Sequence, residues 1–205
     1  MTTASYVVSG FSRTVIAVVV SLTVFLPMLI EARRAATNER AQRARGGVEV
    51  SGDVYAIMQI AYPGAFLLMI LEGATRVGPS VEWLAAGALV FAASKSLKWW
   101  AIQTLGPAWT FRVIVVPGAP LAATGPYRFL RHPNYVAVVG ELIAIALMTK
   151  ARIAGPIAAI GFSLLMLKRI AVEERALSRS RGQVGRVGQV GRVGHGEGRQ
   201  GRSGW

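Results

Sequence analysis

The sequence has no cysteine and few charged residues, and each shortage excludes a class of protein. Without cysteine, neither a disulfide scaffold nor a cysteine-ligated metal site can form. Charged residues make up 16% of the 205 residues and hydrophobic residues 53%, whereas soluble domains average about 25% charged and about 45–50% apolar. Among the charged residues the acidic ones are the fewer, with 10 Asp and Glu against 23 Lys and Arg, which gives a net charge of +13. An ordinary soluble domain is therefore not expected.

Five apolar stretches predict membrane helices, since a helix needs about 20 apolar residues to cross the hydrocarbon core. The stretches are Thr14–Ile30, Val54–Leu71, Val81–Trp100, Tyr135–Thr149 and Ile153–Leu167. The last two are short and lie close together, so we expect them to form a tight helical hairpin; a pair of buried helices in a soluble core is the alternative. The sequence thus predicts an all-α integral membrane protein with about five transmembrane helices.

The basic residues predict the orientation of these helices, because Lys and Arg accumulate in cytoplasmic loops. Lys95 and Lys98 are expected to extend from the end of the third stretch to the cytoplasmic interface. The basic residues on the opposite side are Arg13, Arg76, Lys150 and Arg152. We therefore expect a multi-pass protein with its N-terminus outside and its C-terminus in the cytoplasm.

Two polar segments are expected to lie outside the helices. Ala35–Gly52 is interpreted as a solvated cytoplasmic loop, with an interfacial helical turn as a variant. Residues 179–205 form an Arg/Gly-rich, low-complexity tail in which a Gly-Gln-Val-Gly-Arg-Val unit repeats, and disorder is expected there. The domain division is accordingly a membrane domain at 1–178 and a tail at 179–205. A basic tail is a weak nucleic-acid signal, and no nucleic acid is expected as a partner.

One polar stretch, Gly125–Tyr135, stands at the expected cytoplasmic mouth of the fourth helix and reads G-P-Y-R-F-L-R-H-P-N-Y. Its prolines interrupt helix propagation, and Asn134 is expected to cap the helix that follows. Arg131 and His132 then lie at a helix N-terminus, where backbone N–H groups favour anions. The alternative is an ordinary interfacial turn with extended arginines.

A second polar cluster, Lys168–Arg175, leaves the fifth helix. Arg169 and Glu173 are four residues apart and share a helix face, with Glu174 adjacent. A solvated ion pair is the simple interpretation. The predicted hairpin, however, would bring this cluster back beside Gly125–Tyr135 and form one cytoplasmic pocket.

Glu141 is a carboxylate inside an apolar helix, which makes it a candidate functional residue. An interhelical hydrogen bond is the alternative explanation.

Together the two motifs, G-P-Y-R-x-x-R-H-P-x-Y and R-x-x-x-E-E-x-x-L, resemble the isoprenylcysteine carboxyl methyltransferase family and its bacterial relatives that O-methylate alkylpyrones and similar lipids. The resemblance covers roughly residues 121–177. It implies S-adenosyl-L-methionine as the methyl donor, bound without a Rossmann fold. The absence of a strand–Gly-rich turn–helix unit in the sequence agrees with this.

The resemblance assigns roles by position, and no metal is implied. Arg169 would face the substrate and orient its oxyanion, because the planar guanidinium binds such groups well. Glu141 or His132 would serve as a base if the acceptor were a hydroxyl. The cofactor would be bound by Leu121, Tyr127, Arg131, His132, Pro133, Asn134, Tyr135, Glu173 and Glu174.

The implied activity is O-methylation of a lipophilic acceptor, namely the carboxylate of a prenylated cysteine or, alternatively, the hydroxyl of an alkylpyrone-type lipid. The acceptor would enter from the bilayer and the cofactor from the cytoplasm. A non-catalytic membrane scaffold or transport protein is the rival from another class.

Family members usually continue with F-G-x-x-Y and a proline-containing segment that helps close the cofactor pocket, whereas Ser178 and the Arg/Gly repeats follow here. The sequence leaves the oligomeric state open.

Overall fold

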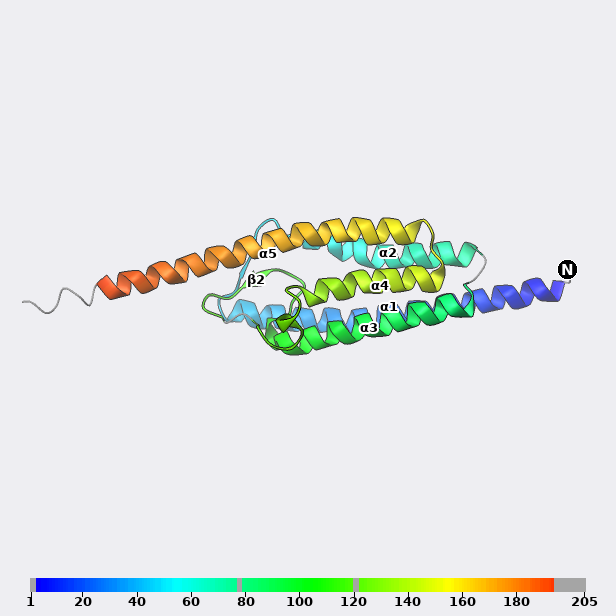
Figure 1. Cartoon of the computed structure of the whole chain (residues 1–205), viewed down its shortest axis with the longest axis horizontal. Coiled ribbons are helices and arrows are strands. Elements are labelled where there is room, and N and C mark those ends of the chain that lie inside the picture. The colour runs from blue at the N-terminus through cyan, green and yellow to red at the C-terminus, as the bar shows by residue number, and fades with distance from the viewer. Residues whose placement is uncertain (1–2, 77–78, 120–121, 194–205) are drawn as a thin grey trace, which may run out of the picture.

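In the part of the chain that the structure describes, five helices lie side by side in an elongated bundle (Figure 1). This computed structural model describes residues 3–76, 79–119 and 122–193. The elements in chain order are α1 (Thr3–Ala44), β1 (Val48–Glu49), α2 (Tyr55–Thr75), α3 (Val81–Leu105), the 3₁₀ turn η1 (Gly106–Ala108), β2 (Ile114–Val115), the 3₁₀ turn η2 (Gly125–Arg128), α4 (Pro133–Thr149) and α5 (Ala154–Val193). Each predicted apolar stretch lies in one of these helices, except that Val54 and Ile153 come one residue before α2 and α5. The predominantly helical prediction is therefore confirmed.

Three helical segments of the described chain are long and apolar enough to cross a membrane: Arg13–Ala44 of α1, Tyr55–Thr75 (α2) and Ala154–Ala176 of α5. Helix α4 is apolar but shorter. Helix α3 is long, yet it carries Glu82, Lys95 and Lys98. The helices therefore support a membrane protein, with three clear candidate spans rather than five.

Large apolar side chains that remain exposed form a belt around the bundle. They extend over Val15–Ile30 of α1, most of α2 and the first part of α5, and over parts of α3 and α4. Among them are Val15, Leu22, Ile30, Ile57, Leu71, Val81, Trp100, Val136, Ile143, Ile153, Leu164 and Leu167. An apolar surface of this extent suits contact with lipid rather than water.

The interpretation of Ala35–Gly52 as a loop is wrong for most of its length, because α1 continues to Ala44. The inward face of this extension packs on the turn after α3. The Asn38 amide donates to the carbonyl oxygens of Gly106 and Trp109, at 3.1 and 2.7 Å, and the Gln42 amide donates to those of Pro107 and Ala108. Arg40 and Arg43, which suggested a solvated loop, are exposed on this helix, and Arg45 follows its last residue.

In the described chain, a small antiparallel ribbon of two-residue strands accompanies the helices and leaves the all-α class intact. Strand β1 pairs with β2, with Val48 opposite Val115 and Glu49 opposite Ile114. Arg112 strengthens the ribbon by contacting Glu49 at 2.5 Å. The ribbon joins the α1–α2 and α3–α4 connections at the end of the bundle that holds the polar motifs.

Helices α4 and α5 are joined by a short connection in which Lys150 adopts a left-handed backbone (φ 53°). Helix α5 then begins against a carboxylate from α2. Glu72 accepts hydrogen bonds from the backbone N–H groups of Arg152, Ile153 and Ala154, at 3.0, 3.1 and 2.7 Å. A carboxylate at this position satisfies the free N–H groups of a helix start and complements the helix dipole.

Helix α5 continues to Val193, so the described part of the tail is helical where the sequence predicts disorder. Extending an existing helix avoids the unfavourable nucleation step, which explains how a Gly-rich repeat can continue one. Residues 194–205 of the predicted tail lie outside the described residues.

Lys95 and Lys98 do not extend to the interface, contrary to the prediction. They point into the bundle and bind two carboxylates, Glu31 of α1 and Glu141 of α4. We call Glu31, Lys95, Lys98 and Glu141 the buried ion cluster. Its charges balance, which makes burial tolerable, because an unpaired charge in an apolar interior is very costly.

Candidate functional site

The turn that carries the first motif is held against α3. Gly125 has a φ of +56°, in the left-handed region that favours glycine, and a Cβ there would collide with the Thr104 hydroxyl and lie 3.1 Å from Trp100 Nε1. Pro126 is buried directly after it. The sequence therefore fixes η2 in close contact with the C-terminal part of α3.

Helix α4 begins at Pro133, one residue before Asn134, which was predicted to cap it. His132 is the N-cap, and Pro133 occupies the first helical position, where its missing N–H costs nothing and its fixed φ suits the helix. The prediction that Asn134 caps α4 is wrong, because Asn134 already lies inside the helix. This start places His132 and Tyr135 one helical turn apart, with their rings stacked at 5.3 Å between centroids.

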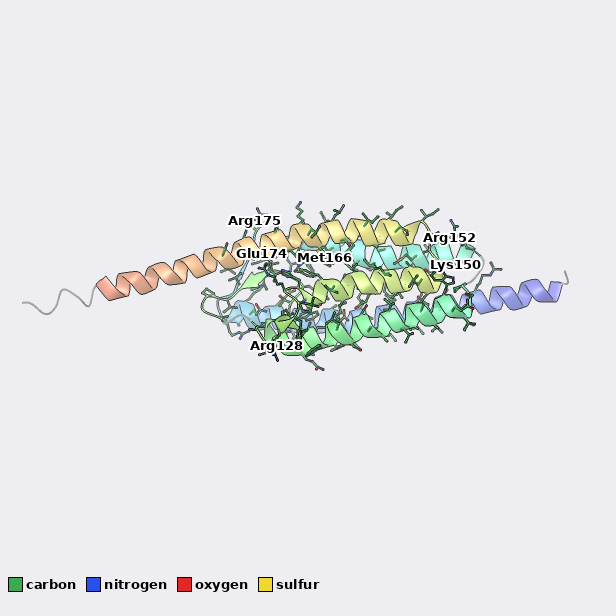
Figure 2. All side chains as sticks on the ribbon, in the orientation of Figure 1. Arg128, Lys150, Arg152, Met166, Glu174 and Arg175 are labelled. Carbon is green, nitrogen blue, oxygen red and sulfur yellow. The ribbon has the colours of Figure 1, made fainter. Side chains whose placement is uncertain are left out.

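The second motif returns to this helix start from α5. The Tyr135 hydroxyl donates to Glu173 Oε2 at 2.9 Å, and His132 Nδ1 lies 3.8 Å from the same oxygen. Glu174 Oε1 lies 3.0 Å from Arg131 Nη2 and 3.8 Å from His132 Nε2. The structure thus brings both motifs together, and Figure 2 shows Glu174 and Arg128 toward the same end of the helical bundle, with Lys150 and Arg152 toward the other.

Two polar atoms at the start of α4 are buried without a hydrogen-bond partner. They are His132 Nε2 and Asn134 Oδ1. Buried polar atoms are nearly always satisfied, so each such exception calls for an explanation. Both belong to residues assigned to the cofactor by resemblance, and an absent ligand is a direct explanation.

Tyr127 lies partly buried in η2, near Glu173. Burial raises the pKa of its phenol, and the negative charge of Glu173 raises it further. Tyr127 therefore keeps its hydroxyl proton and can donate a hydrogen bond at neutral pH. Leu121, also assigned to the cofactor, lies outside the described residues.

Arg169 is buried and surrounded by protein acceptors. Its Nε donates to the Tyr135 hydroxyl at 3.0 Å, Nη1 lies 3.4 Å from Asp53 Oδ1, and Nη2 donates to the Phe111 carbonyl. Asp53 is in turn fixed by the backbone N–H of Val113, at 3.1 Å from Oδ2. Arg169 thus joins α5 to α4 and to both connections of the ribbon.

Asp53 is the site residue that sequence reasoning missed. It immediately precedes the second apolar stretch, Val54–Leu71, and no motif marks it. A carboxylate just before an apolar helix, in a chain with 10 acidic residues, was the available signal. The resemblance gave no reason to connect it to Arg169, more than a hundred residues later.

Glu141 occupies a different place from the other predicted residues. It accepts a hydrogen bond from the Tyr62 hydroxyl at 2.6 Å and lies 3.1 Å from both Lys95 and Lys98. Within the described chain, its recorded polar contacts are with these three residues. The interhelical contact that the sequence left open is therefore present, and Glu141 belongs to the buried ion cluster.

Comparisons with known proteins identify the family. Residues 85–179 match the isoprenylcysteine carboxyl methyltransferase (ICMT) family. The uncharacterised protein YpbQ of Bacillus subtilis is 31% identical over 144 residues, which is 70% of this chain and 85% of that protein. An uncharacterised Haemophilus influenzae protein is 24% identical over 144 residues, 69% of this chain and 83% of that protein. No solved structure matches significantly. The chain therefore belongs to the isoprenylcysteine carboxyl methyltransferase family.

Proposed function

We propose that the protein is a membrane O-methyltransferase that uses S-adenosyl-L-methionine and acts on a lipophilic acceptor. Membership of the family supports a membrane methyltransferase. The observation that carries the finer proposal is the meeting of Glu173 and Glu174 with His132 and Tyr135, beside two buried polar atoms that lack partners.

These residues fit the cofactor chemically. S-adenosyl-L-methionine carries two positive charges, on its sulfonium and amino groups, and Glu173 and Glu174 supply negative charge at the site. His132 Nε2 and Asn134 Oδ1 would find partners among the polar groups of the ribose or of the amino acid portion. The stacked rings of His132 and Tyr135 offer an aromatic surface.

The bound cofactor supplies an electrophilic methyl group, and the protein has to hold the reacting groups and exclude water. Glu173 is held in place by Tyr135, and Tyr135 by Arg169. Each nitrogen of the Arg169 guanidinium already meets a protein acceptor. We therefore assign Arg169 to positioning the site, and direct contact with the acceptor oxygen would require one of these partners to move.

The nature of the acceptor follows from where the site lies. The start of α4 adjoins the end of the exposed apolar belt, where Trp100 and Val136 are its last members on α3 and α4. A lipid-soluble acceptor can reach this level from the bilayer, while a polar cofactor arrives from the aqueous side. A prenylated cysteine carboxylate is our first candidate, because a carboxylate is ionised at neutral pH and needs no base.

An alkylpyrone-type hydroxyl is the second candidate acceptor. It would need a base, and His132 Nε2, which lacks a hydrogen-bond partner, is available for that role. We do not assign this role to Glu141, because its carboxylate is taken up by the buried ion cluster.

We further propose that all five helices are embedded in the bilayer, that α4 and α5 form a hairpin within it, and that the site faces the cytoplasm with the N-terminus outside. The four basic residues assigned to the outer side support this orientation. Arg13 donates to the carbonyl of Arg76 at 3.4 Å, and Lys150 and Arg152 lie at the same end of the bundle (Figure 2).

Binding tests the proposal first. In detergent, we expect calorimetry to detect binding of S-adenosyl-L-methionine, and His132→Ala or Glu173→Ala to weaken it by about tenfold or more, as loss of a charged hydrogen bond does. Lys168→Ala is the matched control, because Lys168 is exposed on the same helix. No binding by the parent chain, or equal binding by all variants, would overturn the proposal.

Methyl transfer from labelled cofactor then identifies the acceptor. A prenylated cysteine, an alkylpyrone and a fatty acid separate a carboxylate from a hydroxyl acceptor and a prenyl from an acyl chain. We expect the prenylated cysteine to be labelled. Labelling of the alkylpyrone alone would select the second candidate. Labelling of none would overturn both candidate acceptors, and labelling of none without cofactor binding would favour a non-catalytic membrane protein.

A further inference from the structure

Two apolar side chains protrude from the connection between η2 and α4. Phe129 is 73% exposed and Leu130 is 37% exposed. They stand between Arg128 and Arg131, both of which are exposed. We call Arg128, Phe129 and Leu130 the apolar finger. Two adjacent large apolar side chains this exposed gain nothing from burial within the protein, so they suggest a surface that meets something apolar.

Along the bundle axis, the apolar finger lies at the same level as the end of the exposed apolar belt. Through Gly125, η2 packs against Trp100 and Thr104 of α3. Trp100 is itself 48% exposed, and on α4 the exposed Val136 lies about one turn after the helix start. Tryptophan is enriched at membrane–water interfaces. The finger is thus placed where the hydrocarbon core gives way to headgroups.

The charges beside the finger are complementary to anionic lipid. The guanidinium of Arg128 lies 5.7 Å from the centre of the Phe129 ring, and no acidic partner of Arg128 is recorded within the described chain. Arg131 differs, because it pairs with Glu174 at 3.0 Å and belongs to the candidate site. Arg128 is therefore the basic group available to a headgroup phosphate, next to an apolar ring that can enter the acyl boundary.

We infer that the apolar finger is a membrane-surface anchor, in which Phe129 and Leu130 insert into the bilayer interface and Arg128 binds anionic phospholipid headgroups. Because Arg131 and His132 follow immediately, insertion holds the start of α4 at the membrane surface. The finger would thus fix the level at which a lipid-borne molecule meets the site. The inference does not depend on which reaction the site performs.

The absence of cysteine makes a direct test simple, since a single introduced cysteine is labelled uniquely. Leu130→Cys would carry a nitroxide spin label and leave Phe129 intact. Two comparison sites are Leu164→Cys in the apolar belt, where Leu164 is 62% exposed, and Thr37→Cys on the exposed side of the α1 extension. Each labelled protein is placed in nanodiscs of phosphatidylcholine with or without phosphatidylglycerol.

In discs with phosphatidylglycerol, we expect the label at 130 to resemble the one at 164, with high accessibility to oxygen and low accessibility to a water-soluble nickel reagent. Replacing the anionic lipid should make the label shallower. Arg128→Gln should remove this lipid dependence, and Lys168→Gln should not. If the label at 130 were as accessible to the nickel reagent as the label at 37, the finger would lie in water. That result would overturn the membrane anchor and favour a soluble binding partner instead.

Two further results would also contradict the inference. Equal depth in neutral and anionic discs would refute headgroup binding by Arg128. Dipolar broadening between labels at 130 would show that the finger contacts a second copy of the chain instead of lipid. Because depth is measured without cofactor or acceptor, failure here is distinguishable from failure of the proposed methyl transfer.

Discussion

The buried ion cluster yields the sharpest prediction about stability. Lys98 is 3% exposed in the bundle, with Glu31 Oε2 at 2.9 Å and Glu141 Oε1 at 3.1 Å from its Nζ. Lys98→Met keeps a helix-forming side chain of similar length and removes the charge. Two buried carboxylates would then share the single ammonium of Lys95.

We expect Lys98→Met to lower the free energy of unfolding strongly, because it leaves a buried carboxylate charge without a full partner. Removing one partner of a buried ion pair typically costs about 3–5 kcal/mol. That is a large fraction of the roughly 5–15 kcal/mol by which folded proteins are stable. We therefore expect Lys98→Met to lower the unfolding midpoint strongly in detergent, followed by circular dichroism during denaturant titration.

A double variant separates charge imbalance from lost packing. Lys98→Met with Glu141→Gln removes one charge of each sign and leaves Glu31 paired with Lys95. We expect it to be more stable than the sum of the single variants implies, by about 1 kcal/mol or more, as for residues in one network. Lys168→Met is the control, and a surface change of this kind shifts stability by no more than about 0.5 kcal/mol. A loss below about 1 kcal/mol in Lys98→Met, or strictly additive effects, would refute the reasoning.

Three further predictions concern single carboxylates. Asp53→Asn should weaken cofactor binding in calorimetry and Asp53→Glu should partly restore it, because Asp53 holds Arg169; unchanged affinity in both would contradict that role. Glu72→Gln should cost roughly 1 kcal/mol in thermal unfolding, since an amide caps the three N–H groups of α5 less well, and an unaltered midpoint would argue against the cap. Hydrogen bonds from two arginines lower the pKa of Glu49, so its contribution is complete above the ordinary pKa of glutamate and is lost as pH falls through the lowered value. Glu49→Gln should therefore make the unfolding midpoint less sensitive to acid, and an equal acid dependence in both proteins would exclude this pair as its source.

The class of protein and the places of the helices could be predicted from the sequence, because both depend on local composition. A charge-free stretch such as Val54–Leu71 is apolar wherever it packs, and it becomes α2. The sequence also predicted that the two motifs meet, and in the structure Tyr135 contacts Glu173. Arg131 and His132 lie at a helix start for a similarly local reason, the proline that follows them.

Predictions from the sequence were wrong for residues whose partners lie far along the chain. Lys95 and Lys98 look like interfacial residues when α3 is considered alone, because nothing in their neighbourhood signals Glu31 or Glu141. The α1 extension looked like a loop for the same reason, since Asn38 finds its acceptors near the end of α3.

What the sequence alone determined is therefore the membrane class, the helix-forming stretches and the family motifs. Only the tertiary structure decided which charges are buried, and it separated Glu141 from the candidate site and added Asp53 to it. The physical reason is that hydrophobicity and proline act on their own segment, whereas the free energy of a charge depends on the partners that folding brings to it.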